Sequence, residues 1–213
     1  MSIDDAYNRW APTYDSDANR TRDLDADVMR QLFASLHVRR FIEAGCGTGK
    51  NSEFFAAHAE ELVALDFSRE MLAKARARTG ATNVAFVLHD LHAPWPVEHG
   101  VADVVSFNLV LEHVRDLAPV LAHAAAACRD GGEVLLTELH PARQYLGGQA
   151  HFQAADGDEV RVPAYLHHLS DYITAAESSG LRLARLHEWW HANDVGKPPR
   201  LVTLRFLKGA LSA

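Results

Sequence analysis

The chain has 213 residues, 48% of them hydrophobic and 23% charged, and a formal net charge of -7. This length suits one domain with a substantial core, 1–213, and the acidic balance without a basic cluster argues against nucleic acid and membrane surfaces as partners. The sequence shows no signal-peptide pattern, no membrane-spanning run and only two cysteines, so we expect a cytoplasmic protein.

The first predicted elements are helical. Aromatic residues at positions 7, 10 and 14 have helical spacing, and Pro12 limits that helix on its C-terminal side. Aromatic residues this dense in a polar segment predict a helical flap over about 1–22, and a helix that only caps the core is the alternative. Apolar residues about four apart predict an amphipathic helix over 23–36.

The segment from Phe41 to Gly49 reads FIEAGCGTG, with glycine at every second position from 45 to 49. This pattern predicts a strand over 39–44, a tight turn and a helix over 50–60. Glycine suits a backbone that turns sharply or lies against a ligand, and unpaired amides at the start of a helix can face that ligand. The dinucleotide pattern G-x-G-x-x-G fails at Lys50, and the phosphate loop G-x-x-x-x-G-K-[ST] fails at two positions.

The pattern that remains is acid-x-G-x-G-x-G, and it resembles motif I of the class I S-adenosylmethionine (SAM)-dependent methyltransferases. A glycine-rich turn in another α/β domain is the alternative. The resemblance implies that Glu43, Gly45, Cys46 and Gly47 bind SAM. The A-x-x-Y-D string near the N-terminus also resembles this family, which implies that Tyr14 lies near the methionine carboxylate of SAM.

A buried parallel strand is predicted over 61–66, and it ends in Asp66. Asp66 lies roughly 20 residues beyond the glycine turn, the spacing at which a carboxylate meets the ribose hydroxyls in dinucleotide folds. The alternative is an acid at the N-terminus of the predicted helix over 69–79. Phe67 and Met71 fall where the family has adenine-packing residues.

The next predicted strand, 83–88, is followed by Asp90 and Leu91. An acid and an apolar residue at this place resemble the adenine clamp of the family. Asp90 would accept from the adenine amino group, and the Leu91 amide would donate to the ring. The alternatives are a turn-forming acid and a leucine packed in a loop.

A fourth strand is predicted over 102–108, and its last residue, Asn108, is a further candidate for cofactor binding. The following L-E-H-V string resembles the ubiquinone-type methyltransferases, some of which bind a divalent cation through an additional acid. Leu109 occupies the position of that acid here. One acid and one histidine are too few ligands for a hard cation, so we predict no required metal. His113 is expected near the methionine moiety of SAM or at the substrate mouth.

A helix over 116–128 and a strand over 133–139 follow, and His140 comes directly after that strand. Ligands of open α/β sheets bind at the carboxyl ends of strands, so His140 is our first candidate for a catalytic base and His113 is the second. A base is needed only if the acceptor carries a proton at neutral pH. The irregular segment 140–168 predicts an acceptor lid, and its candidates for substrate contact are Tyr145, Phe152, His167 and His168.

The remaining elements are a helix over 171–179 capped by Ser170, an alternating strand from 181, and a last strand over 201–207. We expect this last strand to be the antiparallel edge of the sheet. Recurring strand–helix units predict an α/β, Rossmann-like, doubly wound and mostly parallel sheet of seven strands.

The sequence thus predicts a SAM-dependent methyltransferase that transfers a methyl group in line to a small-molecule acceptor, by O- or N-methylation. A carrier-bound acyl acceptor is an alternative. The protein is expected as a monomer or homodimer. Two other functions stay open at this point: an NAD(P)-dependent oxidoreductase on a similar sheet, and a non-catalytic SAM-binding protein.

Overall fold

The computed structural model describes residues 1–153 and 157–209, and its centre is a seven-stranded sheet with the order β3-β2-β1-β4-β5-β9-β8. All neighbouring pairs are parallel except those made by β9. The predicted fold class is therefore confirmed. The strands are β1 (Val38–Ala44), β2 (Ala59–Asp66), β3 (Val84–Leu88), β4 (Ala102–Asn108), β5 (Cys128–Leu139), β8 (Leu181–Trp189) and β9 (Leu201–Lys208).

The prediction that the last strand forms the edge was wrong. β9 lies between β5 and β8, and β8 is the edge strand. The burial of the two strands explains this order: residues 201–204 at the start of β9 are all buried, whereas most of β8 is exposed or only partly buried. An edge strand can present polar residues to water, but an inner strand is covered on both faces.

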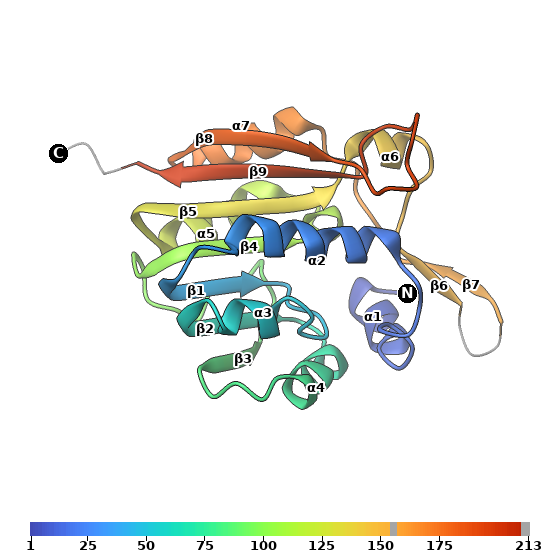
Figure 1. The fold of residues 1–213 in the computed structure, drawn as a ribbon, viewed down its shortest axis with the longest axis horizontal. Helices are drawn as coiled ribbons and strands as arrows, with labels where there is room; N and C mark the ends of the chain where they lie inside the picture. The colour runs from blue at the N-terminus through green and yellow to red at the C-terminus, as the bar shows by residue number, and fades with distance from the viewer. Residues whose placement is uncertain (154–156, 210–213) are drawn as a thin grey trace.

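Helices cover both faces of the sheet (Figure 1). On one face lie α2 (Arg20–Phe33), α3 (Ser52–Ala56) and α4 (Arg69–Arg78), and on the other lie α5 (Leu117–Ala127) and α7 (Leu169–Ser178). Successive residues of β1 serve opposite faces, because side chains alternate along a strand. Phe41 packs against Phe55 and Phe33 below α2, and Ile42 packs in the α5 layer.

Several boundaries differ from the predictions. α2 begins at Arg20 because the Asn19 side chain accepts hydrogen bonds from two amides of its first turn. α3 ends at Ala56 rather than near position 60, because the chain must enter β2 at Ala59 to pair with Val38. β5 begins at 128 instead of 133.

The N-cap of α7 is His168, not the predicted Ser170. The backbone amide of His168 donates to the Asp171 carboxylate at 2.8 Å, which places the start of this helix two residues earlier than predicted.

Three small elements stand at the carboxyl ends of the parallel strands, together with the N-terminal helix α1 (Ile3–Trp10). They are the 3-10 turn η1 (Leu111–His113), the helix α6 (Pro141–Tyr145) and the hairpin of β6 (His151–Gln153) and β7 (Glu159–Arg161). Figure 1 shows α1 and this hairpin on the side toward which the β1 and β5 arrows point. Trp10 of α1 stacks on Phe152 of β6 with ring centroids 5.1 Å apart, so the two segments pack as one cover.

Candidate functional site

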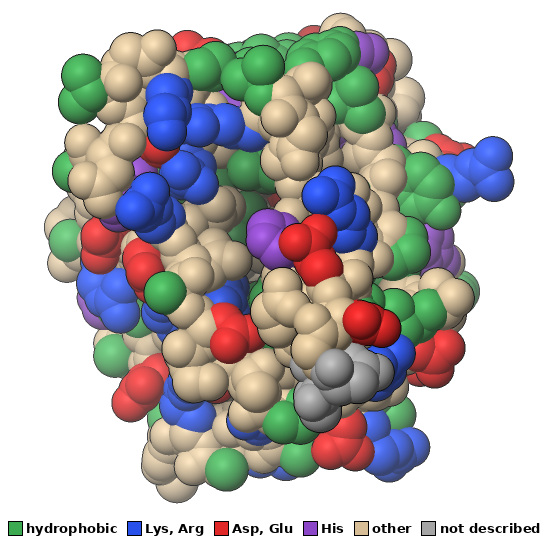
Figure 2. Space-filling view, turned by 90° about the vertical axis from the view of Figure 1, so that its right-hand side faces the viewer, with side chains coloured by type: hydrophobic (Ala, Val, Ile, Leu, Met, Phe, Trp, Pro, Cys, Tyr) green, Lys and Arg blue, Asp and Glu red, His purple; other side chains and the backbone are tan. Residues whose placement is uncertain are grey.

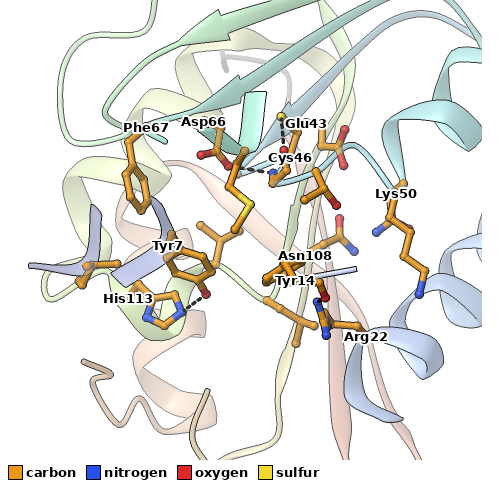
Figure 3. Close-up of a pocket in the computed structure, with 18 of the residues that line it drawn as sticks. Tyr7, Tyr14, Arg22, Glu43, Cys46, Lys50, Asp66, Phe67, Asn108 and His113 are labelled. Carbon is orange, nitrogen blue, oxygen red and sulfur yellow. Dashed lines mark hydrogen bonds between the residues drawn. The ribbon is translucent and has the colours of Figure 1, made fainter. Parts of the chain in front are cut away.

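A cavity of about 530 Å³ lies at the carboxyl ends of β1, β2 and β4, beneath α1 (Figure 3). Such a place, where the strand order reverses between β1 and β4, is where open α/β sheets bind ligands. Every residue predicted to bind the cofactor lines it: Tyr14, Glu43, Gly45, Cys46, Gly47, Asp66, Phe67, Met71, Asp90, Leu91 and Asn108. The structure therefore brings these residues together, and their individual roles stay predictions.

The glycine loop is held to the end of β2. The amides of Gly45 and Cys46 both donate to the Leu65 carbonyl, at 2.7 and 3.0 Å. Gly45 has φ of 79°, and a Cβ there would lie 2.3 Å from a Val110 methyl, so this position requires glycine. Gly47 has φ of 53° with nothing within 4 Å of a Cβ position, so its backbone faces open space.

Asp66 joins this loop to the next helix. One carboxylate oxygen accepts from the Gly47 amide and the other from the Ser68 amide, both at 2.8 Å. Burial raises the pKa of Asp66 to about 6, although these two N–H donors act to lower it. The two readings of Asp66 from the sequence are thus compatible: it orders the start of α4 and it also lines the cavity.

Two further buried acids stand behind the loop. Glu43 accepts from the Ser52 hydroxyl at 2.5 Å, and burial raises its pKa to about 8. Asp25 of α2 accepts from the side-chain amides of Asn51 and Asn108, both at 2.8 Å, and burial raises its pKa to about 6. Sequence reasoning missed Asp25, although an acid among the apolar positions of an amphipathic helix is a visible signal.

Asn108 keeps one polar atom free. Its Nδ2 donates to Asp25, but its Oδ1 is buried and has no hydrogen-bond partner among the described residues. A buried acceptor without a partner is costly, so this atom invites a donor from a ligand. Figure 3 shows Asn108 beside Tyr14 and Arg22.

The N-terminal segment closes this end of the cavity. The Arg22 guanidinium stacks 4.0 Å over the Tyr14 ring and donates to the backbone carbonyls of Tyr14 and Asp17. Asp15 accepts from the Thr48 hydroxyl of the glycine loop at 2.8 Å and also pairs with an arginine of α4. The N-terminal segment is therefore held to the glycine loop by a hydrogen bond and to α4 by an ion pair.

The lining carries more acids than bases. Its arginine and lysine side chains, within the described residues, are Arg22, Lys50 and Arg78. Its acids are Asp4, Asp15, Asp17, Asp23, Asp25, Glu43, Asp66 and Asp90. This balance favours a ligand with positive charge.

The predicted base His113 lies in the cavity wall and contacts Tyr7 of α1 (Figure 3). The Tyr7 hydroxyl is 2.7 Å from His113 Nε2, and His113 Nδ1 is 2.8 Å from the Pro163 carbonyl oxygen. A carbonyl can only accept, so the ring proton is on Nδ1 and Nε2 accepts from the Tyr7 hydroxyl. Sequence reasoning found His113 and the aromatic spacing of Tyr7, but not their contact.

His140, the first candidate for a base, is placed elsewhere. It is the N-cap of α6: its Nδ1 accepts from the Ala142 amide at 3.1 Å, and its Nε2 lies 2.9 Å from Glu188 of β8. His140 is not among the described residues that line the cavity. β5 is separated from β1 by β4, so its carboxyl end lies beyond the crevice. A catalytic role for His140 stays an untested prediction.

The four candidates for substrate contact do not line the described cavity either. Tyr145 and His168 form an exposed pair with 2.8 Å between the hydroxyl and Nδ1. His167 is buried, and its Nε2 is 2.7 Å from the Val114 carbonyl oxygen. Phe152 packs on Trp10 in the cover. The part they take in acceptor binding stays a prediction.

The described part of the chain holds neither a metal-ligand cluster nor a membrane-length apolar helix. No group of three or more His, Cys, Asp or Glu side chains there is arranged to hold a metal ion, and no helix there is long and apolar enough to cross a membrane. On the face that holds α1 and the hairpin, acidic and basic side chains are interspersed (Figure 2).

Residues 16–213 match a family described as a methyltransferase domain. The chain belongs to this methyltransferase family. The methyltransferase is 27% identical to an uncharacterized methyltransferase of Emericella nidulans, over 86% of this chain and 77% of that protein. It is 30% identical to a malonyl-[acyl-carrier protein] O-methyltransferase of Salmonella typhimurium over 71% of this chain, and it spans only 62% of the length of that relative.

Solved structures show the same fold. The methyltransferase superimposes on the N-methyltransferase NodS of Bradyrhizobium japonicum, solved with S-adenosylhomocysteine (SAH), with a TM-score of 0.74, 16% identity and coverage of 99% and 100% of the two chains. A SAM-dependent methyltransferase of Mesorhizobium loti gives a TM-score of 0.71 at 19% identity, with 85% and 96% covered. The predicted class is confirmed: the protein is a class I SAM-dependent methyltransferase, and its cofactor is SAM.

Proposed function

We propose that this methyltransferase binds SAM in the cavity beneath α1 and transfers its methyl group to a small-molecule acceptor, by O- or N-methylation. One observation carries the proposal. The glycine loop, Asp66 and the Asn108 Oδ1 atom, which has no hydrogen-bond partner among the described residues, all line one acidic cavity at the switch point of the sheet. SAM supplies a methyl group that its sulfonium already activates, and the protein supplies position.

The adenosine end would lie along the loop and α4. Each carboxylate oxygen of Asp66 accepts one amide proton and has capacity for another donor, such as a ribose hydroxyl. Because Gly47 has no side chain and faces open space, the adenosine part of SAM could approach its backbone closely. Asp90 and Leu91 line the cavity where an adenine ring would be clamped, and Phe67 borders it.

The methionine end would lie between α2 and the end of β4. Asn108 Oδ1 would accept from the ammonium group, with the Asp25 carboxylate beside it to balance the charge. Arg22 would face the carboxylate, next to Tyr14. Residues with this chemistry fit a zwitterion, and the acidic excess of the lining fits the additional positive charge of the sulfonium.

The acceptor is supported only in outline. The similarity to an enzyme that O-methylates a carrier-bound malonyl group supports O-methylation, and a carrier-bound acyl acceptor is the second candidate. Because His113 lines the cavity and its Nε2 is unprotonated, we propose it as the base if the acceptor must lose a proton.

The test is calorimetric titration of the purified protein with SAH, with NADH as the control ligand. We expect SAH to bind with a dissociation constant on the order of micromolar, about -8 kcal/mol, and NADH not to bind. Binding of NADH alone, or of neither ligand, would contradict the proposed cofactor site.

A further inference from the structure

We propose that Tyr7 and His113 form a proton relay in the middle of the cavity, and that the acceptor carries a hydroxyl group, a phenol or an enol, whose proton this relay removes. The inference rests on the proposed function, because it assigns the acceptor class of the same site. It adds a residue, Tyr7, for which sequence reasoning predicts no chemical role.

Tyr7 lies near the middle of the cavity. Its ring centroid is 6.1 Å from Phe67, at the proposed adenine end, and 6.2 Å from Tyr14, at the proposed methionine end. Tyr7 therefore lies between the two ends of the cavity, where the sulfonium joins the adenosine and methionine parts of SAM. A group that handles the acceptor's proton must lie near this junction.

The hydrogen bonds of Tyr7 and His113 all run in one direction. Pro163 accepts from His113 Nδ1–H, so Nε2 carries a lone pair, and the Tyr7 hydroxyl donates to it. The Tyr7 oxygen keeps lone pairs that can accept from an acceptor O–H. The chain acceptor–Tyr7–His113 is therefore polarised in one direction, from the acceptor to the imidazole.

The charges around the pair support this direction. Burial, with Tyr14, Glu112 and Asp66 also contributing, holds the pKa of Tyr7 well above its ordinary value, while Arg22 acts to lower it. Tyr7 therefore passes a proton on rather than holding a negative charge. The buried Glu112 carboxylate is 3.8 Å from His113 Nε2 and would stabilise the imidazolium that forms.

The charges of the lining also argue against a carboxylate acceptor. Lys50 pairs with Asp23 at 2.9 Å, and Arg78 pairs with Asp15 at 2.7 Å. Arg22 donates to two neutral backbone carbonyls, which do not pair its charge, and the proposed function assigns this guanidinium to the carboxylate of SAM. Within the described residues, no other lysine or arginine lines the cavity, so with SAM bound an anionic acceptor would face an acidic wall without a free cation.

The reaction is balanced as follows. The acceptor proton passes to the Tyr7 oxygen as the Tyr7 proton passes to His113 Nε2. The acceptor oxygen would form the new O–C bond to the methyl group while the C–S bond of SAM breaks. The electron pair of the broken C–S bond would stay on sulfur. The sulfonium loses one positive charge and His113 gains one, so the net charge of the cavity does not change.

The test measures SAH release from SAM near neutral pH with two matched sets of probes: 4-chlorophenol and 4-chlorocatechol, and the carboxylates 4-chlorobenzoate and a malonyl thioester of N-acetylcysteamine. We expect methyl transfer to at least one phenol and none to the carboxylates. Tyr7→Phe and His113→Gln should each lower kcat by about 100-fold, the lower range for loss of a positioned acid–base group, with KM changed less than threefold. His99→Gln, at an exposed histidine outside both the cavity and the segment 140–168, is the matched control for His113→Gln and should keep wild-type kcat.

Two readouts separate a relay from a structural role. The loss in both variants should shrink when the assay pH is raised until the phenol is already ionised, because no proton then needs to be removed. SAH affinity, measured by calorimetry, should be unchanged in both variants. Transfer to a carboxylate but to no phenol, transfer to neither, or an equal loss at every pH would each overturn the inference. Failure of the wild type to bind SAH would instead contradict the proposed function.

Discussion

Glu138 offers a sharp test of the electrostatics of the core. This residue of β5 is 1% exposed; one carboxyl oxygen accepts from the Val110 and Leu111 amides, and the other has no partner among the described residues. Burial raises its pKa from the ordinary 4.5 to about 8. Between these two values the folded chain binds more protons than the unfolded chain, so stability falls as pH rises, by at most about 1.4 kcal/mol per pH unit.

The perturbation is Glu138→Gln, an isosteric change that keeps an oxygen for the two amides but cannot ionise. The stability difference between variant and wild type should grow in favour of the variant from pH 5 to pH 8, by up to about 4 kcal/mol. Urea unfolding at four pH values measures it. Other buried acids, such as Glu43 and Asp25, cancel in this difference. Glu60→Gln, an exposed position on β2, is the control. A pH-independent difference for Glu138→Gln would refute the reasoning.

Three further changes test the site and its supports. Asp66→Ala should weaken SAH binding more than tenfold, about 1.4 kcal/mol, and unchanged affinity in calorimetry would remove Asp66 from the cofactor site. His140→Ala should cost about 1 kcal/mol in urea unfolding through the lost cap of α6 and its contact with Glu188, while SAH affinity stays the same; a loss of affinity would place His140 at the cavity. Asp194→Asn should destabilise the fold by roughly 3 kcal/mol, because the fully buried carboxylate pairs with Arg200 at 2.7 Å, and thermal unfolding unchanged by the substitution would contradict this.

The elements visible in the sequence were those with a local signal. Short apolar stretches marked β1, β2 and β4, and the glycine spacing marked the turn that carries predicted cofactor residues. Asp66 could be placed because it ends one of those strands. Parallel strands bring their carboxyl ends to one edge, so residues at these ends were predicted to meet, and they line one cavity.

The rest depends on pairing between distant segments, which local periodicity does not encode. β9 enters the sheet between β5 and β8, although it follows β8 in the chain. His140 directly follows β5, as predicted. However, β5 is too far from the switch point for His140 to reach the cavity. Tyr7 and His113 are 106 residues apart, and only the folding of α1 over the sheet makes them neighbours.

Every described residue that lines the cavity lies between Ile3 and Val114. The described residues after Val114 support the cavity without lining it, as the Pro163 carbonyl that accepts from His113 and the Phe152 ring that stacks on Trp10 do. Mutational drift can therefore be tolerated there as long as these few contacts survive. If 140–168 is the acceptor lid, as predicted, selection for a new acceptor can act there separately, and chimeras that exchange residues 140–168 between relatives should keep the cofactor affinity of the parent.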